Sequence, residues 1–217
     1  SPDVKALHFQ MVPEVETQIR RLLNGTIDIV SNAFPVKDLA KFRTPAAQSK
    51  FALLEETAAT YRYLVFNTEH PILQKVQVRQ ALARSIHREE LVAFLTKNHA
   101  RLASGVFPPE HAFHTVAQNL AHASESAAAL LEDVGLRLTE GRRFQVRLAT
   151  SNDKEQIRLA RLIADQLARV GIEVNVTPQS PGRLRQALAG GDYDLAVLQD
   201  RVHGDPDVLH TLFHSSQ

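Results

Sequence analysis

The sequence predicts an α/β fold built on a parallel sheet. The clearest support comes from the second half of the chain, where segments with strand patterns alternate with segments with helix patterns. Their order is strand 143–150, a helix ending at Val170, strand 172–177, helix 181–189 and strand 193–199. Strands joined through a helix in this way run parallel, with right-handed crossovers. We therefore expect a β-α-β-α-β unit, with additional helices ahead of it.

The first helix of this unit carries signals at both ends. Asn152 is followed three residues later by Glu155, which is the spacing of a capping box. Leu159, Ile163 and Leu167 recur on one helical face, as expected of a helix that covers a sheet. The glycine that follows Val170 provides a residue that ends a helix easily.

The segments upstream of this unit are predicted with less regular patterns. We expect strands at 4–12 and 61–67, a short extended run at 26–30, and helices at 14–23, 36–41, 76–97 and 124–134. Residues 87–90 can break the 76–97 segment into two helices, and residues 103–120 form a long loop. Ser124 is expected to cap the last of these helices, and Gly135 to end it.

Composition excludes several classes of protein. The 217 residues carry 25 basic and 24 acidic side chains, and this near-neutral balance argues against a nucleic-acid-binding protein. The absence of cysteine excludes disulfides, zinc–cysteine sites and thiol nucleophiles. No apolar run reaches the roughly 20 residues of a membrane-spanning helix. The first ten residues do not have the pattern of a signal peptide.

Two polar loops are expected at one edge of the predicted sheet. In open parallel sheets, ligands bind beyond the carboxyl ends of the strands. Residues 150–153 follow one strand, although Asn152 is more simply explained as a helix cap. Residues 199–206 follow another and contain two carboxylates, a guanidinium and an imidazole. This second loop is either a ligand-binding segment or a set of solvated, locally paired charges.

Catalytic and metal-binding patterns are missing. The sequence has no nucleophile elbow, no Walker phosphate loop and no dinucleotide-binding glycine motif. The pairs His111/His114 and His210/His214 have spacings that two metal ligands can use, but no glutamate completes a zinc motif. We therefore predict neither a cofactor nor a metal site, and no enzymatic activity. A hydrolase built on residues 199–206 is a weaker alternative.

Short motifs recur in a characteristic order along the chain. They are LNGTIDI at 23–29, FNT at 66–68, VRQAL at 78–82, ASGVFPP at 103–109 and GDYDL at 191–195. This series resembles that of the family 5 extracellular solute-binding proteins, the peptide- and nickel-binding receptors of ABC importers. The resemblance covers nearly the whole chain and rests on the order of the motifs rather than on any single one.

The resemblance implies a periplasmic-binding-protein-like lobe and a fragment of a second lobe. Members of the family have two α/β lobes joined by a hinge, and the lobes close on a ligand. By this resemblance, residues 1–61 are a fragment of the first lobe and the approach to the hinge. Residues 62–198 correspond to the second α/β lobe. Residues 199–217 correspond to a ligand-cleft loop and a return segment toward the first lobe.

The resemblance also implies a function in transport. We expect the substrate-capture component of an ABC importer, a monomer that binds a peptide or another small polar solute between its lobes. Its other partner would be the ABC permease in the membrane. The expected location is periplasmic or extracytoplasmic, where a lipid anchor can hold such receptors. The expected cleft contacts are Asn67, Asp200, Arg201, His203 and Asp205.

One departure from the family pattern leaves the ligand open. Peptide-binding members carry Gly-Trp and a following Asp after the last strand, and that Asp meets the peptide amino group. This chain has Gln199-Asp200 in place of Gly-Trp, and only Asp205-Pro206 matches well. The ligand can therefore be a peptide, a nickel chelate, a sugar or another polar solute. A different class of function also remains open: a metabolite-sensing or interaction domain of the same fold inside a regulatory protein.

Overall fold

The protein is described from a computed structural model, which divides into two compact units at residues 57 and 58. The described residues are 4–31, 34, 36–54, 60–96, 99–115, 121–201 and 207. His203, Asp205 and the His210/His214 pair therefore lie outside the described residues. The assignment of residues 1–61, 62–198 and 199–217 to two lobes and a return segment remains a prediction.

The first unit contains three short helices and a small apolar core. The helices are α1 (Val15–Leu23), α2 (Val36–Leu39) and α3 (Pro45–Gln48). Ile19 and Leu22 of α1 meet Phe42, which is 3% exposed and stacks on Phe34 with ring centroids 5.2 Å apart. The predicted helices at 14–23 and 36–41 are thus confirmed, whereas α3 was not predicted.

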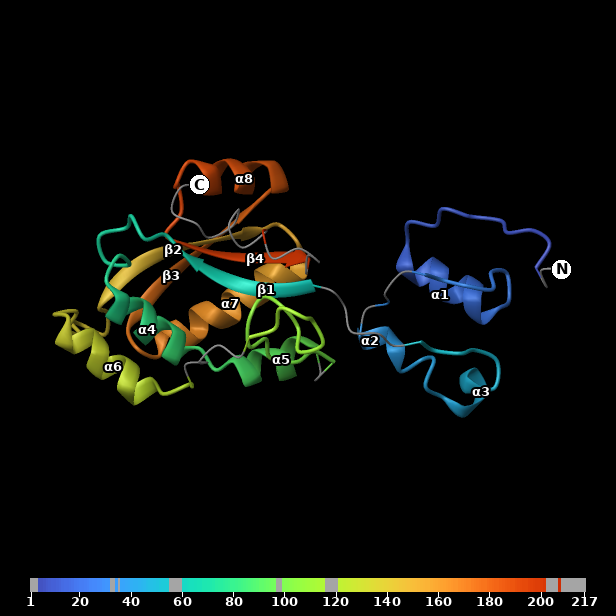
Figure 1. Cartoon of the computed structure of the whole chain (residues 1–217), viewed down its shortest axis with the longest axis horizontal. Coiled ribbons are helices and arrows are strands. Elements are labelled where there is room, and N and C mark those ends of the chain that lie inside the picture. Colours follow the sequence, from blue (N-terminus) through green and yellow to red (C-terminus); the bar gives the residue numbers. More distant parts are fainter. Residues whose placement is uncertain are drawn as a thin grey trace. The chain divides into compact units, whose positions relative to one another are not determined.

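The second unit is a four-stranded sheet covered by helices on both faces (Figure 1). Its elements are β1 (Thr60–Phe66), α4 (Val76–Ser85), α5 (Arg88–Thr96), α6 (Ser124–Asp133), β2 (Phe144–Ser151), α7 (Lys154–Ala168), β3 (Ile172–Gln179), α8 (Pro181–Ala189) and β4 (Leu195–Arg201). The strand order is β1-β4-β2-β3, in which β2 pairs parallel with both β3 and β4. The predicted parallel β-α-β-α-β unit is confirmed.

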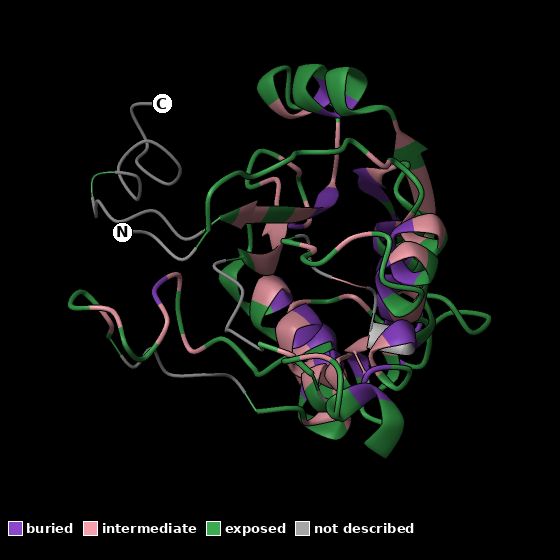
Figure 2. Cartoon of the chain, turned by 90° about the vertical axis from the view of Figure 1, so that its right-hand side faces the viewer, coloured by how far each residue is buried: buried purple, intermediate pink, exposed green. Residues whose placement is uncertain are grey.

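The core lies mainly between the sheet and α7, α4 and α6. Leu148 of β2, Leu167 of α7 and Leu131 of α6 are each fully buried in it. Figure 1 shows α8 alone on the opposite face, where Leu184 packs on Ala149 and Ala196. In Figure 2 the buried residues form stripes on the sides of the helices that face the sheet. No helix of the described residues is both long enough and apolar enough to span a bilayer.

Two strand predictions in the first unit are wrong. Residues 4–12 and 26–30 have no strand structure, because no described segment provides a ladder of hydrogen bonds to either. Leu7, Phe9 and Met11 alternate in the sequence, but all residues from 4 to 11 are exposed, and Met11 is 94% exposed. The pattern describes side chains that a sheet would bury, and no sheet is present in this unit.

Three details of the second unit also differ from the predictions. The cap of α7 is Asp153, not Asn152, because the Asn152 amide donates to the Gln179 carbonyl and extends the β2–β3 pairing by one residue. Ser124 is the first residue of α6 rather than its cap. Strand β4 continues to Arg201, because its antiparallel pairing with β1 extends as far as Thr60. Residues 199–201 are therefore strand, not loop.

Candidate functional site

A polar hollow lies where β2 and β4 end. We call this the carboxyl edge: the side of the sheet at which β2, β3 and β4 end and β1 begins. The hollow has a volume of about 360 Å³. Its lining residues are Arg62, Ser151, Asp153, Glu155, Gln156 and Gln199. They come from β1, β2, β4 and the first turn of α7, so segments far apart in the sequence form one site.

A chain of hydrogen bonds ties these residues together. The Arg62 Nε donates to Gln199 Oε1 at 2.9 Å, and its terminal nitrogen donates to Glu155 Oε2 at 2.9 Å. The Gln156 side-chain nitrogen donates to the same Gln199 oxygen at 3.0 Å. The Gln199 side-chain oxygen thus accepts hydrogen bonds from strand β1 and from helix α7. The antiparallel register explains this meeting, since Arg62 and Gln199 lie directly opposite each other.

Two buried side chains at this edge have polar atoms without a hydrogen-bond partner among the described residues: Gln156, which lines the hollow, and Thr150. Gln156 is 7% exposed, and its side-chain oxygen is buried without a hydrogen-bond donor. Thr150 is fully buried at the end of β2, and its hydroxyl also has no partner. Buried polar atoms normally find a partner, because leaving one without costs about 1–3 kcal/mol. Gln18, Asp38 and Arg84 have such atoms elsewhere in the described residues, so at this edge the unpartnered atoms support a site only together with the hollow.

The opposite face of the same strands carries two tyrosines and a carboxylate. Tyr61 and Tyr63 stack with ring centroids 5.2 Å apart, and Tyr61 pairs with Asp200 in the register. Burial raises the pKa of Tyr63 to about 12, and the negative charges of Tyr61 and Asp200 add to this effect. Burial and Asp200 likewise raise the pKa of Tyr61, whose hydroxyl is buried without a partner. This face therefore disfavours additional negative charge.

Of the five residues predicted from the sequence, the structure describes Asn67, Asp200 and Arg201, and it separates Asn67 from the other two. Asp200 and Arg201 lie at the end of β4, on opposite faces because they are adjacent in a strand. Asn67 lies at the other end of that strand, where its backbone N–H donates to the Asp194 carbonyl at 2.9 Å. Six residues of extended chain separate Asp194 from Asp200, which is about 20 Å. The structure therefore does not bring Asn67 together with Asp200 and Arg201.

Asn67 has a structural role at its own position. Its side-chain nitrogen donates to the carbonyls of Gly191 and Tyr193, at 3.2 and 2.9 Å. Its side-chain oxygen accepts from the Glu69 amide at 3.0 Å. These bonds tie the end of β1 to the turn that precedes β4, and they use both N–H groups of the Asn67 side-chain amide.

Sequence reasoning missed Arg62 and Gln156 as members of the site, and it included Gln199 only as the first residue of the predicted 199–206 loop. Arg62 and Gln199 become neighbours only through the antiparallel β1–β4 pairing, which joins residues 137 positions apart. Gln156 was readable in principle, because a glutamine on the sheet-facing side of a helix is a polar residue in a buried position. The adjacent 150–153 segment was located correctly at the edge, since Ser151 and Asp153 line the hollow.

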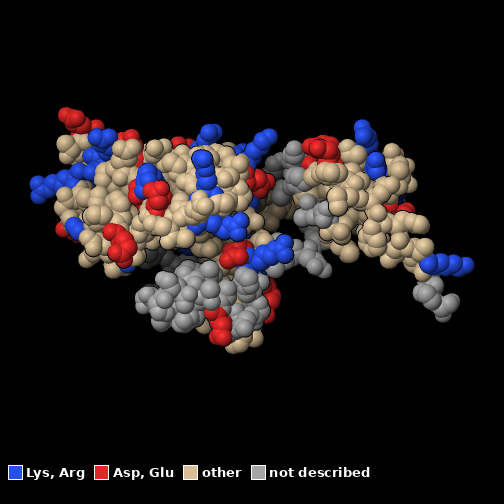
Figure 3. All heavy atoms as spheres, turned by 90° about the horizontal axis from the view of Figure 1, so that it is seen from above, with Lys and Arg blue, Asp and Glu red and all other residues tan. Residues whose placement is uncertain are grey.

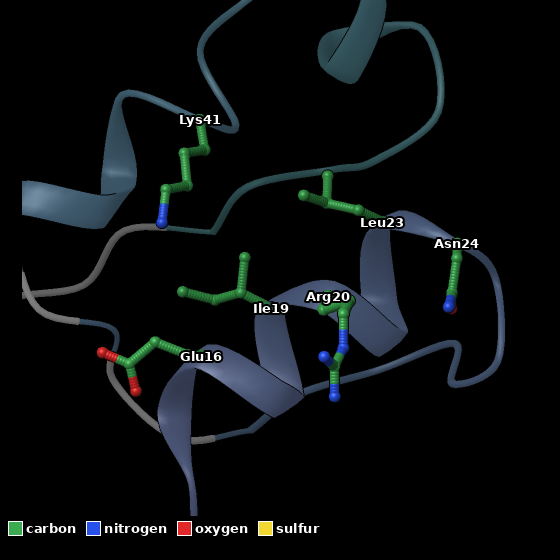
Figure 4. Close-up of a pocket in the computed structure, with 6 residues that line it drawn as sticks. All are labelled: Glu16, Ile19, Arg20, Leu23, Asn24 and Lys41. Atoms are coloured by element: carbon green, nitrogen blue, oxygen red, sulfur yellow. The ribbon is translucent and has the colours of Figure 1, made fainter.

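A second hollow lies in the first unit, beside α1 (Figure 4). Its walls are mainly apolar, with Ile19 and Leu23 flanked by the side chains of Arg20 and Lys41. It contains no network of converging polar groups comparable to that at the carboxyl edge.

The described residues show neither a metal cluster nor a strong field of one charge. No group of three or more metal-binding side chains is present among them. The His111 ring accepts the Phe113 amide through Nδ1 and stacks on Phe107, so it is occupied by local contacts. Figure 3 shows acidic and basic side chains interspersed over the face in view.

Comparison with known proteins identifies the family. The model of the bacterial extracellular solute-binding proteins, family 5 (Middle), matches residues 1–217. This chain belongs to that family. Among curated family 5 relatives, heme-binding protein A of Haemophilus influenzae is 27% identical over 206 residues, which is 93% of this chain. Di/tripeptide-binding protein 2 of Pseudomonas aeruginosa is 24% identical and covers 95%.

Solved structures share the family 5 fold. The substrate-binding protein CtaP of Listeria monocytogenes superimposes with a TM-score of 0.80 at 20% identity, over 94% of this chain. The periplasmic binding protein DppA of Helicobacter pylori, solved in complex with the peptide STSA, has a TM-score of 0.75 at 19% identity. This chain spans only 37–38% of the length of the two curated relatives and 42% of CtaP.

Proposed function

We propose that the protein captures a small polar solute for an ABC importer, and that the carboxyl edge of the second unit is one wall of its binding cleft. The observation that carries this proposal is the hollow lined by Arg62, Gln156 and Gln199, at the edge where open α/β sheets bind ligands. Family membership supports it, because relatives are named for binding heme, peptides or glutathione.

In this function the protein binds its solute and does not transform it. Closure of two lobes on the solute provides the signal for transfer, and the ABC permease in the membrane is the partner that receives it. The protein works outside the cytoplasm. Asp200, Arg201, His203 and Asp205 remain candidate contacts, since Asp200 and Arg201 end β4 and the other two follow it in the sequence.

The proposal is tested on the full-length protein purified from its host. Native mass spectrometry should detect a bound small molecule, and calorimetric titration with a panel of di- and tripeptides should find at least one ligand. Mass analysis of the solute released after prolonged incubation should find it unchanged.

Variants connect binding to the hollow. Replacing Arg62 with Met should weaken binding at least tenfold, because the guanidinium organises Gln199 and Glu155. The matched control is Arg142→Met. Arg142 is an exposed arginine that pairs with Glu173 at the other end of the sheet, where β2 and β3 begin. Equal affinities of the two variants, or conversion of the solute to a product, would contradict the proposal.

A further inference from the structure

We propose that the hollow at the carboxyl edge takes a hydrogen-bond-donating group without negative charge, an amide or an ammonium, and rejects a carboxylate. This inference rests on the proposed function and names the chemical class of the group that the hollow holds. It follows from the charges that line the hollow, from the partners these charges already have, and from the buried acceptor of one lining residue.

The charges that line the hollow are unbalanced. Among its described lining residues Arg62 is the only cation, whereas Asp153 and Glu155 are both acidic, so the net charge is −1. A helix N-terminus normally attracts anions, because its free amides carry about half a positive charge. Here the Asp153 carboxylate already accepts the amides of Glu155 and Gln156, at 2.9 and 3.1 Å. The N-terminal end of α7 is thus already occupied by the Asp153 carboxylate.

The single cation is likewise paired within the protein. Arg62 donates to Glu155 at 2.9 Å and to Gln199 at 2.9 Å, so a solute carboxylate would have to compete with Glu155 for it. The same carboxylate would stand near Asp153 as well. Like charges at such short separations disfavour binding, most strongly where water is excluded.

The buried acceptor favours a donor. Gln156 lines the hollow and is 7% exposed, and its side-chain oxygen is buried without a hydrogen bond among the described residues. Its nitrogen is engaged with Gln199, so a rotation of the amide cannot satisfy the oxygen without breaking that bond. An N–H group of a solute supplies the missing donor. A carboxylate brings none.

Three small probes of similar size test the inference on the full-length protein: acetamide, methylammonium and acetate at equal ionic strength. The readout is the NMR signals of the glutamine side-chain amides, with those of Gln156 and Gln199 assigned through Gln156→Met and Gln199→Met variants. We expect saturable shifts of these signals with acetamide, methylammonium or both. Which of the two binds distinguishes an amide group from an ammonium group. Acetate should bind at least about tenfold more weakly.

A charge variant makes the test independent of the solute. Glu155→Gln keeps a hydrogen-bond partner for Arg62 but removes one negative charge, so acetate should then shift the two signals. Glu173→Gln is the matched control, because Glu173 is a half-exposed glutamate that pairs with Arg142 at the other end of the sheet. Binding of acetate to the unmodified protein at least as tight as that of acetamide would overturn the inference. So would the absence of any shift with all three probes, and that result would leave the calorimetric test of solute capture standing.

Discussion

The two edges of the central sheet use their polar side chains in opposite ways. At the amino edge, where β2, β3 and β4 begin, the side chains of Asn67 and Arg143 donate hydrogen bonds to backbone carbonyls. At the carboxyl edge, atoms of Tyr61, Thr150 and Gln156 are buried without partners. The polar groups at the amino edge thus hold the fold, whereas our proposal assigns those of the carboxyl edge to the solute.

The largest expected effect is at Arg143, on the amino edge. Its side chain is 5% exposed and bonds the carbonyls of Val170 and Leu136 and the carboxylate of Glu132. Arg143→Met should lower the free energy of unfolding by about 3 kcal/mol, because two carbonyls lose their donor. The adjacent Arg142→Met should cost less than about 1 kcal/mol, since that arginine is 61% exposed. Urea denaturation measures both, and equal losses would contradict the difference in role.

A smaller loss is expected at Asn67. Asn67→Ala removes the bonds to Gly191, Tyr193 and Glu69 and should cost about 1.5 kcal/mol. Solute affinity should be unchanged, because the residue lies at the amino edge. Asn175→Ala, in the exposed part of β3, serves as the control for stability. A loss of solute affinity without a loss of stability would show that Asn67 contacts the solute, and would contradict the difference between the two edges.

The pH dependence of stability tests the carboxyl edge. The pKa of Tyr63 is raised to about 12 in the folded protein, from an ordinary value of 10.0. The folded state therefore holds this proton more tightly, and the stability it contributes is present below pH 10 and lost as pH rises toward 12. Because the ring is only partly buried, the loss should be about 1 kcal/mol rather than the full value of the shift. Tyr63→Phe should remove this part of the alkaline loss, as followed by urea denaturation from pH 9 to pH 11; an unchanged slope would contradict the effect.

The parallel part of the sheet could be predicted from the sequence, whereas the antiparallel contact between β1 and β4 could not. The parallel unit was predictable because the apolar residues within 143–150 and 172–177 mark the buried positions, so each strand can be recognised from its own sequence. The segment at 150–153 was correctly located because strand order alone fixes which ends lie together. The Arg62–Gln199 contact was not predictable, since it depends on the antiparallel register of β1, which no local pattern records.

Failures at the first unit have a different physical origin. The alternation of residues 4–12 is typical of a strand, but a strand also requires a partner, and no described segment of this chain provides one.

The wrong helix cap in the second unit has another cause. The Asn152 amide donates to the Gln179 carbonyl of β3, so α7 is capped by the next polar residue, Asp153.

The most direct test of the difference between the edges is one helix with two buried glutamines. Gln156 and Gln166 both lie on α7, and they are 7% and 4% exposed. Gln166, toward the amino edge, accepts the His87 amide at 3.0 Å and donates to Glu90 at 2.9 Å. Gln156 has an unpartnered oxygen. Methionine has a similar volume and helix propensity, so a Gln-to-Met change isolates the amide.

Urea denaturation of Gln166→Met and Gln156→Met in the full-length protein measures this difference. We predict that Gln166→Met lowers the free energy of unfolding by about 2 kcal/mol, because it leaves the His87 amide without an acceptor. Gln156→Met should change it by less than about 0.5 kcal/mol, because the lost bond to Gln199 is offset by removal of the unpartnered oxygen. A loss at Gln156 as large as that at Gln166 would show that the carboxyl edge holds the fold in the same way as the amino edge, and would contradict the account.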